Sequence, residues 1–346
     1  MENVRLWWDY IWGMVSDFLL NAETPGHKLA LMVLAIALFV VVMGGILFAV
    51  DKPKRVPSWL VTAAFAGPAL LFLAFGLVYP ALRTVYQSFF NRNGQTFVGG
   101  DNYMAAFTEP AFQIVLRNTA MWVLLVPILA TFIGLVYAVV VDRTRFEKIA
   151  KALVFLPMAI SLVGASIIWR FVYEYRDAGD QGQRQQTGLL NQILVGLGME
   201  PQQFLLHQPW NNLFLIAVLI WIQAGFAMTI LSAAIRAIPD DIIEAARLDG
   251  LKGVQMFRYI TVPSIRPALV VVVTTIAMTT LKVFDIVRTM TGGQFGTSVV
   301  ANEFYNQSFV LGDGGMGAAL AVILFIIVIP VVIYNVRQLR LSEEIR

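Results

Sequence analysis

The chain has 346 residues, of which 58% are hydrophobic and 14% are charged, with a net charge of +3. Soluble domains carry about 25% charged residues, so this composition excludes a soluble protein and predicts an all-α protein that lies in a bilayer. The absence of cysteine excludes disulfides and thiolate sites, and two histidines leave no metal site to expect. The net charge is too small to indicate a nucleic-acid partner.

Seven apolar stretches are each long enough to cross a bilayer, which takes about 20 helical residues. Asn118 stands at the start of the third stretch, where it is expected to cap the helix. The sixth stretch is the weakest, because Lys282 and Asp285 interrupt its far end. The predicted spans are residues 29–50, 59–80, 118–141, 152–173, 213–235, 267–287 and 317–335.

The distribution of lysine and arginine predicts the orientation of these spans. Connections on one side hold fifteen of these residues and connections on the other side hold nine, and the more basic side is normally cytoplasmic. We therefore expect a multi-pass protein of a bacterial cytoplasmic membrane, with the N-terminus outside and the C-terminus inside. The fifteen lie in residues 51–57, 142–151, 236–266 and 335–346.

Residues 1–56 are expected to form an N-terminal part of their own, an interfacial segment followed by one extra span. Four acidic residues among the first 28 argue against a cleaved signal peptide. The aromatic residues there indicate a helix at the outer membrane interface, and the simpler alternative is an aromatic belt element that anchors the first span. The hinge at 51–57 then leads into residues 57–346. The polar connection 174–212 is expected to be a small subdomain or a mobile loop, with no chemistry assigned.

The connection 236–266 differs from a plain linker. Asp240 or Asp241 can cap a short helix after Pro239, and Gly250 can end it. A second helical stretch is expected to run to Ile260, before Pro263 opens the next span. Small alanine side chains on such a helix let another protein approach closely, which predicts a docking surface. The alternative is a solvated, charged connector with a glycine turn.

The spacing within this connection resembles the EAA loop of binding-protein-dependent ABC importers. Glu244-Ala245-Ala246 is followed after three residues by Gly250 and after nine more by Ile260-Thr261-Val262-Pro263. Only Val262 departs from the family pattern, which has leucine there. The flanking Ala237–Asp241 and the segments Phe284–Val287 and Thr291–Gly293 are similar to carbohydrate permeases of the maltose and α-glucoside type.

This resemblance implies a six-span permease core in residues 57–346 and a role for the loop as a coupling helix. It assigns contact with a separate dimer of ATP-binding subunits to Glu244, Ala245, Ala246 and Gly250, and we include Asp249 in this set. A second permease subunit, an extracytoplasmic sugar-binding protein and membrane lipid complete the expected partners. No lysine is followed by serine or threonine, so the ATP-binding motif GxxxxGK[ST] is absent, and no catalytic residue or cofactor is expected.

A stripe of residues on the sixth span is the first candidate for the sugar path. Thr275, Thr279 and Lys282 follow one another at helical spacing with Met278 beside them, and Asp285 is placed to pair with Lys282. Trp221 and Gln223 on the fifth span are further candidates, because sugars bind aromatic faces and amides. The resemblance to maltose-type permeases places sugar contacts on these two spans.

Simpler explanations exist for the same residues. Threonine in a span often bonds to its own helix, and a lysine near a helix end often extends to the membrane surface. Trp169 and Arg170, at the end of the fourth span, are interpreted as interface anchors.

The residues therefore favour one permease subunit of an ATP-driven sugar importer. Within the same family, glycerol phosphate or another polyol is the alternative substrate, although a phosphate ester would want several cations in the path. A self-sufficient secondary carrier would want an internal repeat and buried ion-coupling groups, and a membrane enzyme would want acid–base residues within reach. The chain shows neither pattern.

Overall fold

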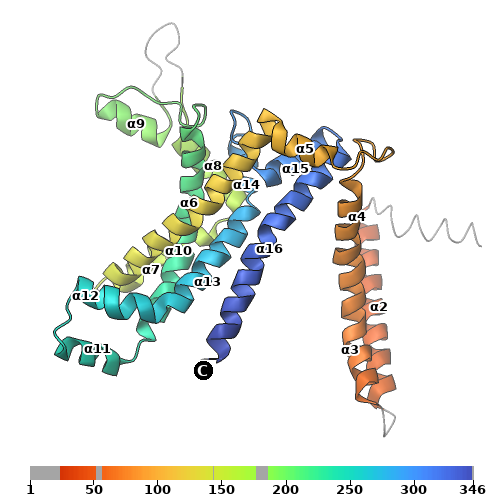
Figure 1. The fold of residues 1–346 in the computed structure, drawn as a ribbon, viewed down its shortest axis with the longest axis horizontal. Coiled ribbons are helices and arrows are strands. Elements are labelled where there is room, and N and C mark those ends of the chain that lie inside the picture. Colours follow the sequence, from red (N-terminus) through yellow and green to blue (C-terminus); the bar gives the residue numbers. More distant parts are fainter. Residues whose placement is uncertain (1–23, 52–56, 143, 177–185, 345–346) are drawn as a thin grey trace, which may run out of the picture. The chain divides into compact units, whose positions relative to one another are not determined.

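The computed structural model describes residues 24–51, 57–142, 144–176 and 186–344. The predicted interfacial segment with its aromatic run, most of the hinge, and the centre of the polar connection lie outside these ranges. The described residues form helices joined by turns, which confirms the all-α membrane fold (Figure 1). They fall into two compact units, Met1–Leu82 and Arg83–Arg346. The assignment of residues 1–56 as an addition to 57–346 stays a prediction.

The first unit holds two long apolar helices. Helix α2 covers Pro25–Asp51, and α3 (Ser58–Leu73) continues through the π-helix η1 (Ala74–Val78) into α4 (Tyr79–Gln87). Large apolar side chains point outward on these helices, such as Leu38 at 65% exposed and Phe72 at 78%. A helix that is apolar on all sides is stable in hydrocarbon, so these helices are suited to lipid contact.

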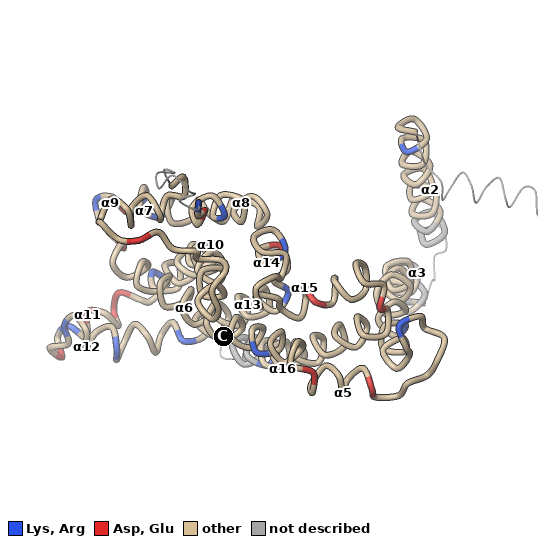
Figure 2. Tube along the Cα trace, turned by 90° about the horizontal axis from the view of Figure 1, so that it is seen from above, with Lys and Arg blue, Asp and Glu red and all other residues tan. Residues whose placement is uncertain are grey.

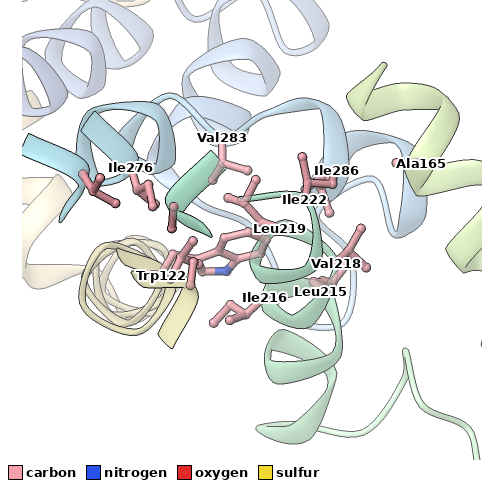
Figure 3. Close-up of a cluster of buried hydrophobic side chains, with 14 of the residues drawn as sticks. Trp122, Ala165, Leu215, Ile216, Val218, Leu219, Ile222, Ile276, Val283 and Ile286 are labelled. Atoms are coloured by element: carbon pink, nitrogen blue, oxygen red, sulfur yellow. The ribbon is translucent and has the colours of Figure 1, made fainter. Parts of the chain in front are cut away.

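The second unit is a bundle built on α6 (Pro110–Val141), α10 (Trp210–Arg236), α13 (Val262–Leu281) and α16 (Gly314–Glu344). Trp122 of α6 is fully buried between the apolar faces of α10 and α13, where Leu219 and Ile276 meet it (Figure 3). Gly134 lets α6 approach α10 closely, because an added Cβ would lie 2.5 Å from the side chain of Ala227. Packing in this core fixes the positions of α6, α10 and α13 relative to one another.

Six described helices are long and apolar enough to cross a membrane, and a bent pair gives a possible seventh. The prediction of one continuous helix over 152–173 was wrong. Helix α7 (Glu147–Phe155) and the 3-10 turn η2 (Leu156–Ala159) are separated from α8 (Leu162–Val172) by a bend of 103°. Pro157 lacks a backbone donor, and the Ser161 hydroxyl accepts a bond from Gly164 N at 3.1 Å to begin a new helix.

The third and sixth spans also differ from the prediction. Helix α6 begins at Pro110, so Asn118 lies inside the helix and does not cap it. Helix α13 ends at Leu281, and the chain turns at Lys282 into a separate short helix. The remaining short elements are α5 (Asp101–Thr108), α9 (Leu189–Gly196), α11 (Asp240–Leu248), α12 (Val254–Met256), η3 (Phe257–Thr261), α14 (Asp285–Met290), α15 (Val300–Tyr305) and η4 (Asn306–Val310).

Candidate functional site

Helix α11 is the short helix expected in the connection 236–266. It follows the N-cap Pro239, and Asp240 and Asp241 lie in its first turn, where they meet the positive end of the helix, and do not act as the cap. Gly250 has a φ of +85° and ends the helix. Because a Cβ at Gly250 would meet nothing within 4 Å, the requirement for glycine comes from the backbone conformation alone.

The two faces of α11 have different roles. Ala246 is 4% exposed and Ile243 packs against the apolar core, so these residues tie the helix to the bundle. Glu244 and Ala245 are exposed on the other side, and Leu248 is 89% exposed. The tube in Figure 2 shows acidic and basic residues close together around α11. A short helix with a charged and apolar exposed face is a suitable docking element.

The next segment joins α11 to the sixth span. Gly253 has a φ of +51°, and a helix then runs from Val254 to Leu281, with five residues in π-helical form at 257–261. The expected second helical stretch therefore exists, but it is continuous with the span. Only the short turn at 249–253 separates α11 from this helix, so a movement of α11 can reach α13 over a short distance along the chain.

A group of polar residues lies beside α11, which we call the coupling-end cluster: Asp142, Glu147, Lys151, Ser232 and Arg236. The Arg236 Nε lies 2.9 Å from Asp142 Oδ1, and its guanidinium also pairs with Glu147. The Lys151 Nζ lies 2.7 Å from Glu147 Oε1 and donates to the hydroxyl of Ser232.

This cluster connects the ends of α6, α7 and α10. Sequence analysis missed it because its members come from three separate segments, although the spacing of Glu147 and Lys151 is that of a helical ion pair. A cavity of about 660 Å³ separates the cluster from α11, with Arg236 and Arg247 on its walls.

The stripe expected on α13 is only partly helical. Thr275 and Met278 are half-buried and Thr279 is exposed, but Lys282 lies just past the helix end. The Thr279 hydroxyl donates to the Thr275 carbonyl oxygen at 3.0 Å, as the simpler explanation required. Among the described residues no ion pair joins Lys282 to Asp285, so that expected pairing is wrong.

The fifth-span candidates do not lie together. The ring of Trp221 meets that of Trp169 edge to face, with centroids 5.5 Å apart. Trp169 is thus half-buried between helices and is not a simple interface anchor, whereas Arg170 is exposed. Gln223 is two residues from Trp221, about 200° around the helix, so it lies on the opposite side. Within the described chain, no hydrogen bond or ring contact joins either residue to the α13 stripe.

Amide side chains near the other end of the bundle hold a loop in position. Asn118 donates to the carbonyl oxygens of Gly296 and Ser298, at 2.7 and 3.0 Å. Asn211 donates to the carbonyl oxygen of Phe295 at 2.8 Å, and Phe295 itself has a φ of +57°. Such a backbone persists only where the surroundings hold it. The signal in the sequence was an uncharged amide inside an apolar span.

Comparisons with known proteins identify the family of this chain. Residues 103–340 match the family described as "Binding-protein-dependent transport system inner membrane component". The osmoprotective compounds uptake permease protein of Synechocystis sp. is 48% identical over 282 residues, covering 82% of this chain and 100% of the relative. The alpha-glucoside transport system permease protein of Rhizobium meliloti is 50% identical over 286 residues, covering 82% and 83%.

The chain belongs to this family of inner membrane transport components and is a permease subunit. A solved bacterial alginate ABC transporter, in complex with a pentasaccharide-bound periplasmic protein, has a chain of similar fold. The two chains superpose with a TM-score of 0.68 and are 22% identical in sequence. The match covers 80% of this chain and 92% of the transporter chain. At this identity the likeness supports the fold, and the family match identifies the class.

Proposed function

We propose that this permease forms half of the translocation path of an ATP-driven importer for a sugar such as an α-glucoside. The observation that carries the proposal is the exposed face of α11, held to the bundle by Ala246 and ended by Gly250 at a φ of +85°. A separate pair of ATP-binding subunits would dock on Glu244 and Ala245. The end of the bundle that carries α11 would then face the cytoplasm, with the C-terminus inside.

The movement of the ATP-binding subunits would reach the spans through two connections of the described structure. The helix from Val254 to Leu281 links the segment after α11 to the α13 stripe. The coupling-end cluster links α6, α7 and α10 beside the same helix. Closure of the ATP-binding subunits would therefore move several spans together.

The substrate class rests on the relatives and on the chemistry of the candidate path. The alpha-glucoside permease is 50% identical to this chain, and Thr275, Thr279 and Lys282 offer hydroxyl and ammonium groups near the end of α13. Lys282 is the single cation of this stripe, which favours a neutral sugar over a phosphate ester. A second permease would complete the path, and an extracytoplasmic binding protein would deliver the sugar.

A second candidate substrate has its own support. The relative for osmoprotective compounds is 48% identical and is matched over its whole length. A polyol or another osmoprotective solute is therefore the alternative cargo of the same machinery.

Reconstitution tests the proposal directly. The chain would be placed in liposomes with its second permease, ATP-binding subunits and binding protein, and uptake of labelled α-glucosides and osmoprotective solutes would be measured. We expect uptake only with ATP and all subunits, and loss of coupled hydrolysis in Glu244→Lys. Glu200→Lys, an exposed charge reversal far from α11 in sequence and fold, is the control. Uptake by the chain alone would establish a self-sufficient carrier and contradict the proposal.

A further inference from the structure

A second cavity is lined by the last turns of α8. Figure 1 shows α8 near the end of the bundle opposite α11. Its volume is about 490 Å³, within the range of sites that hold small molecules. The walls come from the end of α8 and from the segment that precedes α10. The lining residues are Ile167, Arg170, Phe171, Tyr173, Glu174, Tyr175, Gln203, Phe204, Leu205 and Leu206.

The two walls of this cavity are tied together by one buried amide. Asn191 donates to the Glu174 carbonyl oxygen at 2.8 Å and to the Gln202 carbonyl oxygen at 3.1 Å. Its own side-chain oxygen accepts a bond from Gln202 N at 2.8 Å. The rings of Tyr173 and Phe204, one from each wall, have centroids 5.7 Å apart. The cavity is therefore part of a packed structure.

The lining combines apolar side chains with one cation, Arg170. Ile167 and Phe171 are 45% and 64% exposed and lie on one face of α8. Arg170 stands on the same side, exposed, with no ion pair or hydrogen bond among the described residues. The neighbouring carboxylate of Glu174 has partners other than Arg170, because it accepts from the Thr187 hydroxyl at 2.9 Å and lies 3.9 Å from the Nε of Arg176. Arg170 is thus available to an anion.

This face of α8 is not the face that meets α10. Trp169 lies about 200° around the helix from Phe171 and packs on Trp221. The cavity therefore opens away from the fifth-span candidates of the sugar path. On this face the exposed apolar side chains lead up to a polar group that holds one cation, Arg170, together with Glu174 and Tyr175. An exposed apolar row beside a guanidinium fits a lipid chain and its headgroup better than it fits the hydroxyls of a sugar.

We propose that this cavity binds one anionic phospholipid of the surrounding bilayer. The acyl chain would lie along Ile167 and Phe171, and the phosphate would pair with Arg170 near the headgroup level, with Tyr175 beside it. Apolar contact and a guanidinium–phosphate bond match the two parts of such a lipid. The inference needs only that the bundle is embedded in a membrane, and it does not depend on which sugar is moved.

Native mass spectrometry of the assembled complex tests the site. The detergent-purified complex would be titrated with phosphatidylglycerol or with phosphatidylcholine. We expect tighter retention of phosphatidylglycerol, weakened about tenfold in Arg170→Gln and largely restored in Arg170→Lys. Arg117→Gln, which removes an exposed cation of α6 outside the lining, should match the wild type. Equal binding of both lipids, or unchanged binding in Arg170→Gln, would overturn the proposal.

A second measurement retains Arg170 and tests whether lipid or the second permease covers the cavity. The chain has no native cysteine, so a single fluorescent label at Phe171→Cys is unambiguous. Brominated phosphatidylglycerol should quench it at lower mole fractions than brominated phosphatidylcholine. If assembly with the second permease shields the label from both lipids, this face is a protein interface and the lipid proposal is wrong.

Discussion

Arg236, the last residue of α10, pairs with Asp142 at the end of α6, with Nε and Oδ1 2.9 Å apart. The two helices are also in contact along their length, so this pair ties their ends together beside α11. The side chain of Arg236 is 51% exposed and that of Asp142 is 13% exposed, so solvent screens the pair mainly on the arginine side and its contribution to stability is modest. Its position indicates a role in how the spans move with the coupling helix.

Replacing Asp142 with asparagine tests that role. We expect a modest fall in Tm, because Arg236 is half exposed but the side chain of Asp142 is only 13% exposed, together with a lower ratio of uptake to ATP hydrolysis in the reconstituted complex. Arg236→Gln should lower the ratio of uptake to ATP hydrolysis to the same extent. The double variant should show a ratio no lower than that of either single variant. Additive losses in the double variant would show that the two residues act separately.

Gly250→Ala should disturb the end of α11 without a steric clash. An L-residue in the left-handed region costs roughly 1–2 kcal/mol, and no neighbouring atom lies within 4 Å of the new Cβ. We expect the complex to assemble but sugar-stimulated ATP hydrolysis to fall. Gly198→Ala is the matched control, because Gly198 has a φ of +78° and equally open surroundings near the other end of the bundle. Equal hydrolysis in the two variants would remove the coupling role of Gly250.

Thr279→Val should reduce transport with the fold retained. If the exposed hydroxyl contacts sugar, its loss is worth about 0.5–1.5 kcal/mol, or roughly a threefold to tenfold weakening of uptake. Thr280→Val is the control, because Thr280 makes the same bond to its own helix but is 1% exposed. Both variants lose one such bond, so a structural effect alone would lower uptake in both to a similar extent.

Single cysteines map the α13 stripe. Positions 275, 279 and 282 should react with a small water-soluble thiol reagent, and transported sugar should protect them. Positions 276 and 280 should react poorly, since both native side chains are 1% exposed. Labelling that is equal at all five positions, with no protection by any transported sugar, would leave Trp221 and Gln223 as the remaining candidates.

Local periodicity and spacing were sufficient for several features. The apolar runs predicted the spans, because a bilayer requires about 20 apolar residues in any helix that crosses it. The position of α11 and the turn at Gly250 also followed from the sequence, because capping, acidic residues in the first turn and a left-handed glycine act over a few residues. The same spacing indicated the family, which the comparisons confirmed.

Other features depend on residues that are distant in the sequence. The coupling-end cluster joins Asp142, Glu147 and Arg236 from three helices, and no local pattern brings them together. The sequence predicts that Asn118 caps a helix. In the structure its amide instead donates to carbonyl oxygens of the loop at 295–298. The broken fourth span, by contrast, has a local cause, because Ser161 begins a new helix within a hydrophobic run that looks continuous.

The candidate sugar path shows most clearly which features are local and which depend on tertiary contacts. The sequence by itself determined that Trp221 and Gln223 share one helix and that Thr275 and Thr279 share another, because helix geometry is local. Only the tertiary structure decided that Trp221 turns toward Trp169 and that the chain leaves the helix at Lys282. The physical reason is that packing between helices selects which side of each one is buried, and that choice is made by contacts across the bundle.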